Sequence, residues 1–534
     1  MVPNPSYIPP KRVAIIGGGI SGISCLWGLR EEESTEVYLY EADNRLGGHA
    51  NSVGVKSEDG KVHSVDTGFV TMSEQMYPKF NAFLNALNVP TMETDMSFGV
   101  MEDDRSVEWG SCSFEGFYGS LSRLFSLWFW RLVFDIIRFN FFATDILSEK
   151  VSEELKLASG NEKLSSKKLK LESIGEYLDR KNYSRQFKQY YLLPMIAAPW
   201  CMSLSDVANG FPAETLVYFM YIHRMLDTMT ETLCWRAFKN GSRTYVEKFV
   251  ETTPENHHYH LNTPIQRIIR NQGDDQASLV FKDGSVDSFD HVVLAVHAHQ
   301  ALDLLGEQST SLEKDVLGAF RTSRNECVMH SDLTFLPQNP KAHASWICHM
   351  RSNRTSDKDM SAGKLSETKP LLETSDSKDS TTATETDGPV SVLFDMNRLQ
   401  EIPGPGSPGS PGRILISMNP IRTPQSIRTQ HLYYHPILDS PSIQASRSLN
   451  ELNRASPNVS FAGAWMGYGF HEDGFAAGLE VSHKLRTGEY ENQSSVRYGA
   501  DLAAWVPKLS TRNLMVRSVI GAVQLVIDLK KLLI

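Results

Sequence analysis

The chain has 534 residues and a mass of 59.9 kDa, so it is long enough for two or more folded lobes around a large core. Hydrophobic residues make up 41% and charged residues 22%, which excludes a mostly disordered, collagen-like or polytopic membrane chain. The formal net charge of -10 disfavours nucleic acid as a partner. Six scattered cysteines without a CxxC pair predict neither a metal cluster nor a disulfide framework, and a reducing, cytoplasmic compartment fits best.

The first unit is a short apolar strand that enters a glycine-rich turn and continues as a helix. In this GxGxxG pattern, Gly17 permits the tight bend, Gly19 lets the backbone approach a pyrophosphate, and Gly22 lets helix and strand pack closely. The helix N-terminus then faces the phosphates. A second strand at 36–40 ends at Glu41, at the roughly 20-residue offset where an acid accepts hydrogen bonds from a ribose. An ordinary tight turn and a solvated strand-end acid are the structural alternatives.

A second glycine pair follows in the string RLGGH, where the glycines again allow close backbone approach and the arginine can serve a phosphate. The strings VAIIGGGISG and YEADNRLGGH together resemble the flavin-containing amine oxidase superfamily, whose members carry such a pair after the ribose-binding glutamate. Asp66-Thr67-Gly68 also resembles the superfamily's next strand, near the isoalloxazine. The resemblance implies bound FAD, with Gly17, Gly19, Ser21 and Gly22 around the pyrophosphate, Glu41 on the ribose, and Arg45, Gly47 and Gly48 along the dinucleotide.

Residues 114–147 are rich in aromatic side chains, and three charged residues interrupt their apolar core. The spacing of Arg131, Asp135 and Arg138 places these charges on one helical face. Such a helix is either buried with an internal ion pair or lies in a membrane interface, and a spanning helix would have to accommodate three charges near its centre. We keep all three alternatives open.

Several later segments fit the same superfamily. Residues 174–200 predict a buried helix broken by proline and resemble the substrate lobe of predicted NAD/FAD-binding amine-oxidase-like proteins associated with cyclopropane fatty acid synthases. Residues 235–249 resemble the superfamily's return to the FAD domain, and Ile265 resembles the aliphatic residue that backs the adenine. Residues 325–346 match the same subgroup, and His330 within them is interpreted as a hydrogen-bonded structural histidine rather than a catalytic one.

The most specific segment is 461–478, whose string GYGFHEDG closely matches the subgroup. It predicts a strand, a glycine turn and a helix whose N-terminus faces the flavin. The resemblance implies that Gly463, Asp473 and Gly474 bind FAD. The cysteine that bonds FAD covalently in monoamine oxidases is absent, which implies non-covalent FAD.

His471 and Glu472 are the candidate catalytic residues, because both are expected beside the flavin and either can move a substrate proton. The alternative for His471 is a structural hydrogen bond that shapes the loop. For Glu472 and Asp473 the alternative is stabilisation of the helix N-terminus by their negative charge.

The last helix, at 514–534, has one narrow polar face and an almost wholly apolar remainder. Polar groups through its middle favour a position in a membrane interface, or packing on the protein, over a crossing. Its polar face comprises Arg517, Gly521, Gln524, Asp528 and Lys531.

These segments predict an α/β protein with a discontinuous Rossmann-like FAD-binding domain and an α+β substrate lobe. The FAD-binding domain is expected from 11–110, 235–305 and 451–490, the substrate lobe from 111–234 and 306–450, and an amphipathic C-terminal helix from 510–534. Within the second part of the substrate lobe, 352–390 predicts a disordered insertion and 403–412 a flexible loop.

We expect an FAD-dependent oxidoreductase that transfers a hydride from a substrate C–H bond to flavin N5, acting on a lipid or fatty acyl group that is desaturated. The alternatives are a flavin-dependent fatty acid double-bond isomerase, an amine oxidase, and a non-catalytic lipid-binding protein of the GDP-dissociation-inhibitor type. The partner is then a small lipid-like molecule and not nucleic acid. A cytoplasmic location is expected, with peripheral contact with a membrane as an open alternative.

Overall fold

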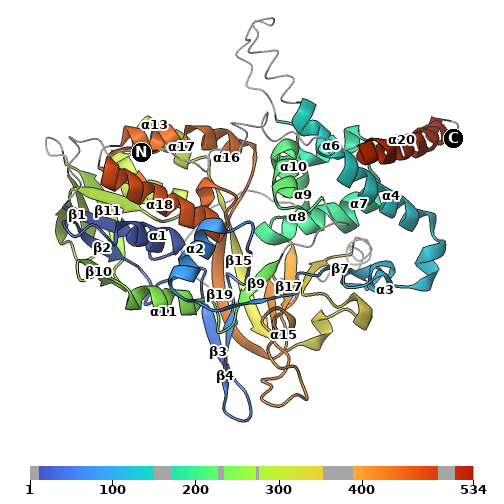
Figure 1. Cartoon of the computed structure of the whole chain (residues 1–534), viewed down its shortest axis with the longest axis horizontal. Coiled ribbons are helices and arrows are strands. Elements are labelled where there is room, and N and C mark those ends of the chain that lie inside the picture. Colours follow the sequence, from blue (N-terminus) through green and yellow to red (C-terminus); the bar gives the residue numbers. More distant parts are fainter. Residues whose placement is uncertain are drawn as a thin grey trace, which may run out of the picture.

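The structure of the protein is a computed structural model that describes residues 11–149, 171–226, 234–271, 276–352, 389–456, 458–490 and 511–532. Nearly all of the predicted insertion at 352–390 therefore lies outside the described residues. The parallel sheet and its helices form one half of the molecule, and a larger sheet with a helical cluster forms the other half (Figure 1).

A five-stranded parallel sheet lies at the centre of the first half, with the order β10-β2-β1-β14-β20 (Figure 1). Its apolar central strands are buried, as expected for a parallel sheet covered on both faces. The predicted α/β fold class is confirmed. The strands come from three distant parts of the chain: β1 (Arg12–Ile16), β2 (Glu36–Tyr40), β10 (His257–His260), β14 (His291–Leu294) and β20 (Val459–Phe461).

Two helices from opposite ends of the chain pack together beside this sheet: α1 (Ile20–Leu29) and α18 (His471–Thr487). A Cβ at Gly28 would lie 1.9 Å from Ser482 Oγ, and one at Gly478 would lie 2.0 Å from Ser24 Oγ. The two helices therefore approach more closely than larger residues would allow. The same half contains α2 (Pro78–Ala86), α11 (Arg243–Glu251), α12 (Ala298–Leu305), α13 (Ser311–Leu317), α16 (Ser440–Ala445), α17 (Leu449–Ala455) and the sheet β11 (Ile265–Arg270), β12 (Ala277–Phe281) and β13 (Val286–Phe289).

The second half is built on a seven-stranded sheet in the order β19-β15-β18-β17-β16-β7-β8. Its neighbouring strands are antiparallel except for β16 and β7, which are parallel. The strands are β7 (Phe98–Glu102), β8 (Glu108–Gly110), β15 (Thr322–His330), β16 (Trp346–Met350), β17 (Ser391–Asp395), β18 (Leu415–Met418) and β19 (Ile427–Pro436).

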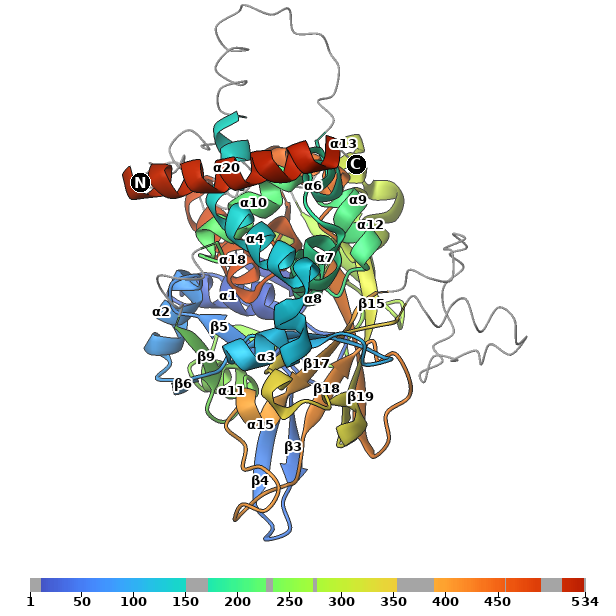
Figure 2. The same ribbon diagram turned by 90° about the vertical axis from the view of Figure 1, so that its right-hand side faces the viewer.

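Smaller strand pairs join the two halves, and a helical cluster covers one side of the second half (Figures 1 and 2). The joining strands are β3 (Ser52–Lys56) with β4 (Val62–Asp66), and β5 (Thr71–Ser73) with β9 (Trp235–Phe238) and β6 (Thr91–Glu93). The helices of this cluster are α3 (Phe114–Tyr118), η1 (Leu121–Phe125), α4 (Leu127–Phe142), α6 (Ile174–Arg180), α7 (Arg185–Phe187), α8 (Leu193–Trp200), α9 (Leu204–Gly210) and α10 (Ala213–Ile222). The short helix α15 (Met396–Leu399) lies apart from them, next to β17 and β18.

The helix predicted over 174–200 is broken, but the break lies before the first proline of the segment, Pro194. The chain leaves α6 at Arg180, and Asn182 has a left-handed backbone with φ of 56°. Ser184 then caps α7 by accepting a hydrogen bond from the Phe187 backbone N–H. The helix therefore ends at a left-handed turn, well before the first proline of the segment.

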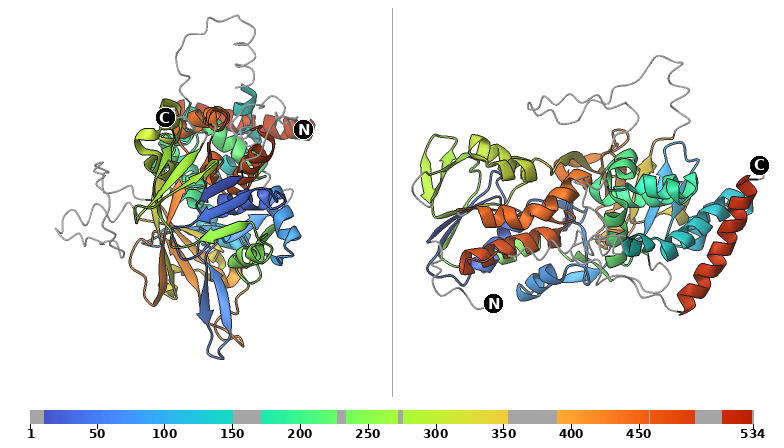
Figure 3. Two further views of the ribbon diagram at one scale, coloured as in Figure 1. Left: turned by 90° about the vertical axis from the view of Figure 1, so that its left-hand side faces the viewer. Right: turned by 90° about the horizontal axis from the view of Figure 1, so that it is seen from above.

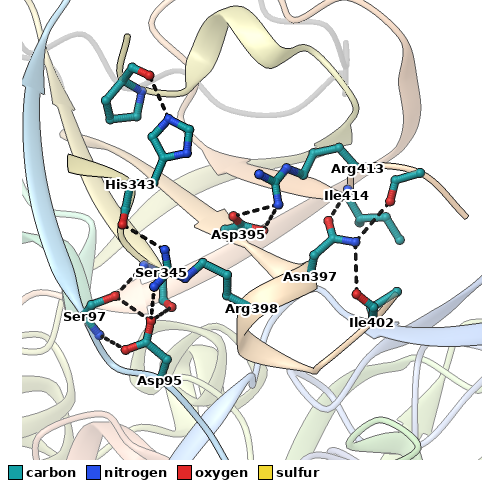
Figure 4. Close-up of polar contacts among 12 residues, drawn as sticks. Asp95, Ser97, His343, Ser345, Asp395, Asn397, Arg398, Ile402, Arg413 and Ile414 are labelled. Atoms are coloured by element: carbon teal, nitrogen blue, oxygen red, sulfur yellow. Dashed lines mark hydrogen bonds and ion pairs between the residues drawn. The ribbon is translucent and has the colours of Figure 1, made fainter. Parts of the chain in front are cut away.

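The loop at 403–412, predicted to be flexible, is held by side-chain hydrogen bonds (Figure 4). Asn397 Nδ2 donates to the carbonyl oxygens of Ile402 and Gly412, at 3.2 and 3.0 Å. Asn397 Oδ1 accepts from the Ile414 backbone N–H at 2.8 Å. One buried amide thus holds both ends of the loop in place.

The aromatic region 114–147 is divided into α3, η1, α4 and the start of a further helical segment at 145–149. On α4 the side chain of Asp135 is fully buried between Arg131 and Arg138, with N–O distances of 2.9 and 3.2 Å. For the middle of α4, this geometry agrees with the alternative of a buried helix with an internal ion pair. The last helix, α20 (Thr511–Leu532), crosses α4 at one end of the molecule (Figures 2 and 3). Within the described ranges, no helix combines the length and apolarity needed to cross a bilayer.

A buried carboxylate joins the two halves. Asp66 Oδ1, at the end of β4, accepts hydrogen bonds from Ser52 Oγ at 2.6 Å and from the backbone N–H and Oγ of Ser242, both at 2.7 Å. Its other oxygen accepts from Gln400 Nε2 at 3.0 Å. Burial raises the pKa of Asp66 to about 6 although these donors act in the opposite direction. Three segments of the chain therefore meet at one side chain.

Replacing Asp66 by alanine leaves buried serine and amide donors without their acceptor. We expect the free energy of unfolding to fall by about 3 kcal/mol or more. Urea unfolding measures this loss, and the exposed Asp315→Ala on α13 serves as the control, expected to stay within about 0.5 kcal/mol of the parent. Equal midpoints for the two variants would contradict a joining role for Asp66.

Candidate functional site

A cavity of about 990 Å³ lies between the two halves of the molecule. Its lining includes Gly17 and Glu41 from the parallel sheet and its first turns, and Phe219 and Trp346 from the second half. A cavity of this size, with polar groups at one end, is typical of a site that holds a cofactor and a substrate together.

The glycine turn after β1 has the geometry that a phosphate requires. Gly17 has φ of +107°, and a Cβ at Gly22 would lie 2.0 Å from the Gly17 carbonyl oxygen. By contrast, a Cβ at Gly19 would meet no atom within 4 Å, and Gly19 lines the cavity together with Ser21. The open space at Gly19 therefore lies at the N-terminus of α1, where backbone N–H groups favour an anion.

The side chain of Glu41 is held at the edge of the same cavity. Its carboxylate accepts hydrogen bonds from the Gly18 backbone N–H at 2.7 Å and the Asp43 backbone N–H at 2.8 Å. A carboxylate has about four acceptor positions, so two donors leave it able to bind ribose hydroxyls. Ile265, predicted beside the adenine, also lines the cavity. These residues fit the adenosine end of FAD.

In the second glycine pair, Gly48 lines the cavity, whereas Arg45 and Gly47 are not part of the lining. Arg45 Nη2 donates to the Gly48 carbonyl oxygen at 2.8 Å, and Nη1 donates to the Ala50 carbonyl oxygen at 3.4 Å. Arg45 therefore helps to shape this turn, and the phosphate contact predicted for it stays a prediction.

The C-terminal motif divides into residues that line the cavity and residues that hold helices. Gly463 and His471 line the cavity, whereas Glu472, Asp473 and Gly474 do not. A Cβ at Gly474 would lie 2.7 Å from a side-chain carbon of α1, so this glycine serves close helix packing.

The two acids of this motif stabilise helix N-termini. The Glu472 carboxylate accepts from the backbone N–H groups of Lys79 and Phe80, at 3.1 and 2.9 Å, in the first turn of α2. Asp473 accepts from the Phe470 backbone N–H at 2.9 Å, at the start of its own helix. This geometry favours the helix-terminal alternative and gives no support to catalysis by Glu472 or cofactor binding by Asp473.

His471 is held firmly in the wall of the cavity. Its ring stacks on Phe69 with a centroid distance of 3.6 Å and an interplanar angle of 4°, and Nε2 lies 3.1 Å from Tyr245 Oη. Burial lowers the pKa of His471 well below its ordinary value, so the ring is neutral at physiological pH. A neutral, stacked imidazole is a weak base in this position.

Four further histidines line the cavity and were missed from the sequence. One is His223, directly after α10, whose Nδ1 lies 2.8 Å from the Phe219 carbonyl oxygen. The other three are His49, His297 and His435. Burial is the main cause that lowers their pKa values, to about 3 for His49 and His297 and about 4 for His435. His49 directly follows the second glycine pair, which could have indicated it. The other two follow no motif. All three rings are uncharged near neutral pH, so they add no positive charge to the cavity.

His330 lies outside the cavity lining. Its Nε2 is 2.9 Å from Ser417 Oγ, and the side chain is buried. The structural interpretation of this histidine is therefore confirmed.

The part of the cavity in the second half is mainly apolar. Among the described lining residues the carboxylates are Glu41 and Asp303, on elements of the first half, and the cationic side chain is Arg224, just after α10. A substrate in the second half therefore contacts hydrocarbon and aromatic surface and can reach one arginine. The apolar lining comprises Met195, Ile196, Pro199, Phe219, Trp346, Phe394, Met418 and Phe470.

Comparison with known proteins gives one family. The model of the family described as flavin containing amine oxidoreductase matches residues 20–323, which is more than half of the chain. Lysine-specific histone demethylase 1 of Schizosaccharomyces pombe is 29% identical over 112 residues. That match covers 18% of this chain and 11% of the length of the demethylase.

Several solved structures share the fold. A putative protoporphyrinogen oxidase from Exiguobacterium sp. 255-15 is 13% identical, with a TM-score of 0.54 over 90% of this chain and 99% of the other. A CLA-producing fatty acid isomerase from P. acnes is 12% identical, with a TM-score of 0.55 over 90% and 99%. Cyclohexylamine oxidase from Brevibacterium oxydans is 13% identical, with a TM-score of 0.55 over 89% and 99%. At these identities the likeness shows the fold alone.

A side chain at Gly19 should block the cofactor without disturbing the fold, because it would project into open space. We expect Gly19→Val to fold normally and to lose at least about tenfold in flavin affinity. Flavin absorbance per chain after reconstitution measures this, with Gly404→Val, another glycine with open space around its Cβ position, as the control. If the Gly19→Val variant still bound one flavin per chain, the phosphates of the cofactor would have to bind elsewhere.

The buried histidines predict a loss of stability in acid. Because the folded-state pKa of His435, about 4, lies below the ordinary value of 6.5, its stabilising effect is complete above pH 6.5 and is lost as pH falls toward 4. Each such histidine contributes a slope of about 1.4 kcal/mol per pH unit. We expect His435→Gln to remove about one such slope from urea unfolding curves recorded across this window. An unchanged slope in His435→Gln would contradict the neutral state of this ring.

Proposed function

The chain belongs to the flavin containing amine oxidoreductase family, whose members are FAD-dependent oxidoreductases, and on that premise we propose that it oxidises a C–H bond of a lipid-like, acid-headed substrate such as a fatty acyl group. The apolar lining of the second half of the cavity carries this proposal. A long hydrocarbon chain there is shielded from water on most of its surface.

The residues of the first half fit FAD. The N-terminus of α1, with Gly19 and Ser21, would hold the pyrophosphate, and Glu41 would hold the ribose. When bound, FAD accepts the two electrons and the hydrogen that leave the substrate C–H bond. The C-terminal motif lacks the cysteine that would form a covalent bond with FAD, so the proposed FAD is bound non-covalently.

The chain's own residues orient the substrate and exclude water. Walls contributed by α8 and α10 surround a hydrocarbon chain, and Arg224 offers a guanidinium to a carboxylate head group. The ring of His471, fixed between Phe69 and Tyr245, gives the wall a defined shape. Its catalytic role remains a prediction, and its low basicity favours positioning over proton transfer.

An amine substrate suits this lining less well. A protonated amine requires a nearby carboxylate or a polar site, and the carboxylates of the described lining, Glu41 and Asp303, lie with the adenosine end. Arg224, at the other end, offers no acceptor for an amine. Charge in the cavity therefore supports an acid over an amine.

The resemblance to proteins associated with cyclopropane fatty acid synthases is part of the same proposal. The substrate-lobe motif that suggested it includes α8, from which Met195, Ile196 and Pro199 contribute to the apolar wall. A long-chain acyl lipid, unsaturated or modified, fits such a wall. Desaturation would remove one hydrogen with two electrons to FAD and a second hydrogen as a proton, with an external electron acceptor restoring the oxidised cofactor.

Anaerobic titration of the flavin-loaded protein tests the proposal. We expect an unsaturated fatty acid series to bleach the flavin band, and a primary amine series of matched chain length to leave it unchanged. Arg224→Met should weaken the response to the acids by about tenfold, because it removes a charged hydrogen bond. The matched control is Arg243→Met on α11, an exposed arginine outside the cavity lining.

The outcomes separate the alternatives. Bleaching by the amines alone would contradict the proposal and favour an amine oxidase. Conversion of a fatty acid without lasting bleaching would favour the double-bond isomerase. Binding of fatty acid by a chain that takes up no FAD would favour a lipid-binding protein without redox chemistry.

A further inference from the structure

The helix α20 packs on the protein through its polar side. Arg517 Nε donates to the Phe141 carbonyl oxygen at 2.9 Å, and Arg517 Nη2 lies 2.6 Å from Asp145 Oδ1. Gln524 accepts a hydrogen bond from Arg138 of α4. The polar side chains at the middle of α20 are thus directed toward α4, which reverses the usual orientation of a surface helix.

The opposite side of α20 is exposed and apolar. Ser518, which lies on this side, donates its hydroxyl to the Leu514 carbonyl oxygen at 3.0 Å, so its polarity is satisfied within the helix. Seven large apolar side chains there are between 42% and 67% exposed: Leu514, Met515, Val519, Val523, Leu525, Val526 and Leu529.

A second exposed apolar group lies at the same end of the molecule, on η1 and the start of α4 (Figure 2). Phe125 and Leu127 are 90% and 87% exposed, and Leu121 and Trp130 are also exposed. Trp130 Nε1 donates to the Leu124 carbonyl oxygen at 2.7 Å, so this indole also has its polar group satisfied. Large side chains exposed to this extent mark a surface that another phase or molecule covers.

We propose that the exposed faces of α20, η1 and the start of α4 form a docking surface for an anionic lipid bilayer. The helix α20 lies along the outer edge of the molecule, as Figure 3 shows from above, and its 22 residues span about 33 Å at 1.5 Å per residue. A long, exposed ridge with apolar side chains along its length matches the plane of a bilayer interface.

The charge of the C-terminal segment favours an anionic lipid bilayer over a second copy of the chain as the molecule that covers this surface. The sequence from 511 to 534 has four basic residues and one acidic residue, in a chain whose formal net charge is -10. Basic residues beside an apolar helix face are attracted to anionic head groups. A second copy docked through the same face would instead bring this basic segment against its own like charges. The apolar side of α20 would lie in the membrane interface while its polar side stays on α4. The polar contacts to α4 would hold α20 in a fixed position on the protein.

This proposal does not depend on the substrate, and a binding measurement tests it without turnover. The full-length, flavin-loaded chain is mixed with vesicles of phosphatidylcholine, with or without about one quarter phosphatidylserine. Flotation then separates bound from free protein. We expect binding to the anionic vesicles, weakened by salt, and at least about a tenfold loss of affinity in the double variant Val519→Glu, Val526→Glu.

The control is the double variant Val62→Glu, Val286→Glu, whose valines are 63% and 57% exposed on strands of other parts of the fold, against 65% for each of Val519 and Val526. It should bind as the parent does. Flavin content and circular dichroism should be equal in all three proteins.

Two results would overturn the proposal. One is parent protein that stays with the free fraction for both vesicle types. The other is a Val519→Glu, Val526→Glu variant that floats as well as the parent. Self-association of the parent that this variant abolishes, with no vesicle binding, would instead identify a second copy as the occupant.

Discussion

The buried carboxylate of Asp66 is the contact on which the relation between the two halves of the molecule depends. It accepts donors from Ser52, Ser242 and Gln400, which lie far apart in the chain. The three residues that follow it, at 67–69, line the cavity. An acceptor that satisfies several buried donors at once fixes its neighbours more tightly than apolar packing does, because each misplaced donor would carry a desolvation cost. The cavity wall is therefore set by the same group that joins the segments.

The cavity formed in this way offers two kinds of surface. At one end, backbone N–H groups at the start of α1 and the carboxylate of Glu41 suit a dinucleotide. At the other, the walls are hydrocarbon and aromatic, and the cavity-lining rings of His49, His297 and His435 are neutral. Redox chemistry at a C–H bond requires this combination, since the cofactor needs polar anchoring whereas the reacting carbon is best kept away from water.

The features that could be predicted best from the sequence are those that depend on local backbone geometry. The glycines at 17, 19 and 22 and the acid at 41 carry their roles in their spacing, and the structure places them accordingly. Roles that depend on where a side chain points were harder to predict. Glu472 follows His471 directly, but neighbouring helix positions point about 100° apart, so one faces the cavity and the other caps α2. The orientation of α20 could not be predicted either, because an amphipathic pattern does not say which face meets the protein.

The visible spectrum of the purified chain, recorded before and after acid precipitation, tests the central claim that this cavity holds FAD beside an apolar compartment. We expect a yellow protein with one flavin per chain, which is released into the acid supernatant because no covalent bond retains it. We also expect a shift of the bound flavin band on adding a long-chain fatty acid under air-free conditions. A colourless protein that takes up no added FAD would contradict it, whatever lipid the chain binds.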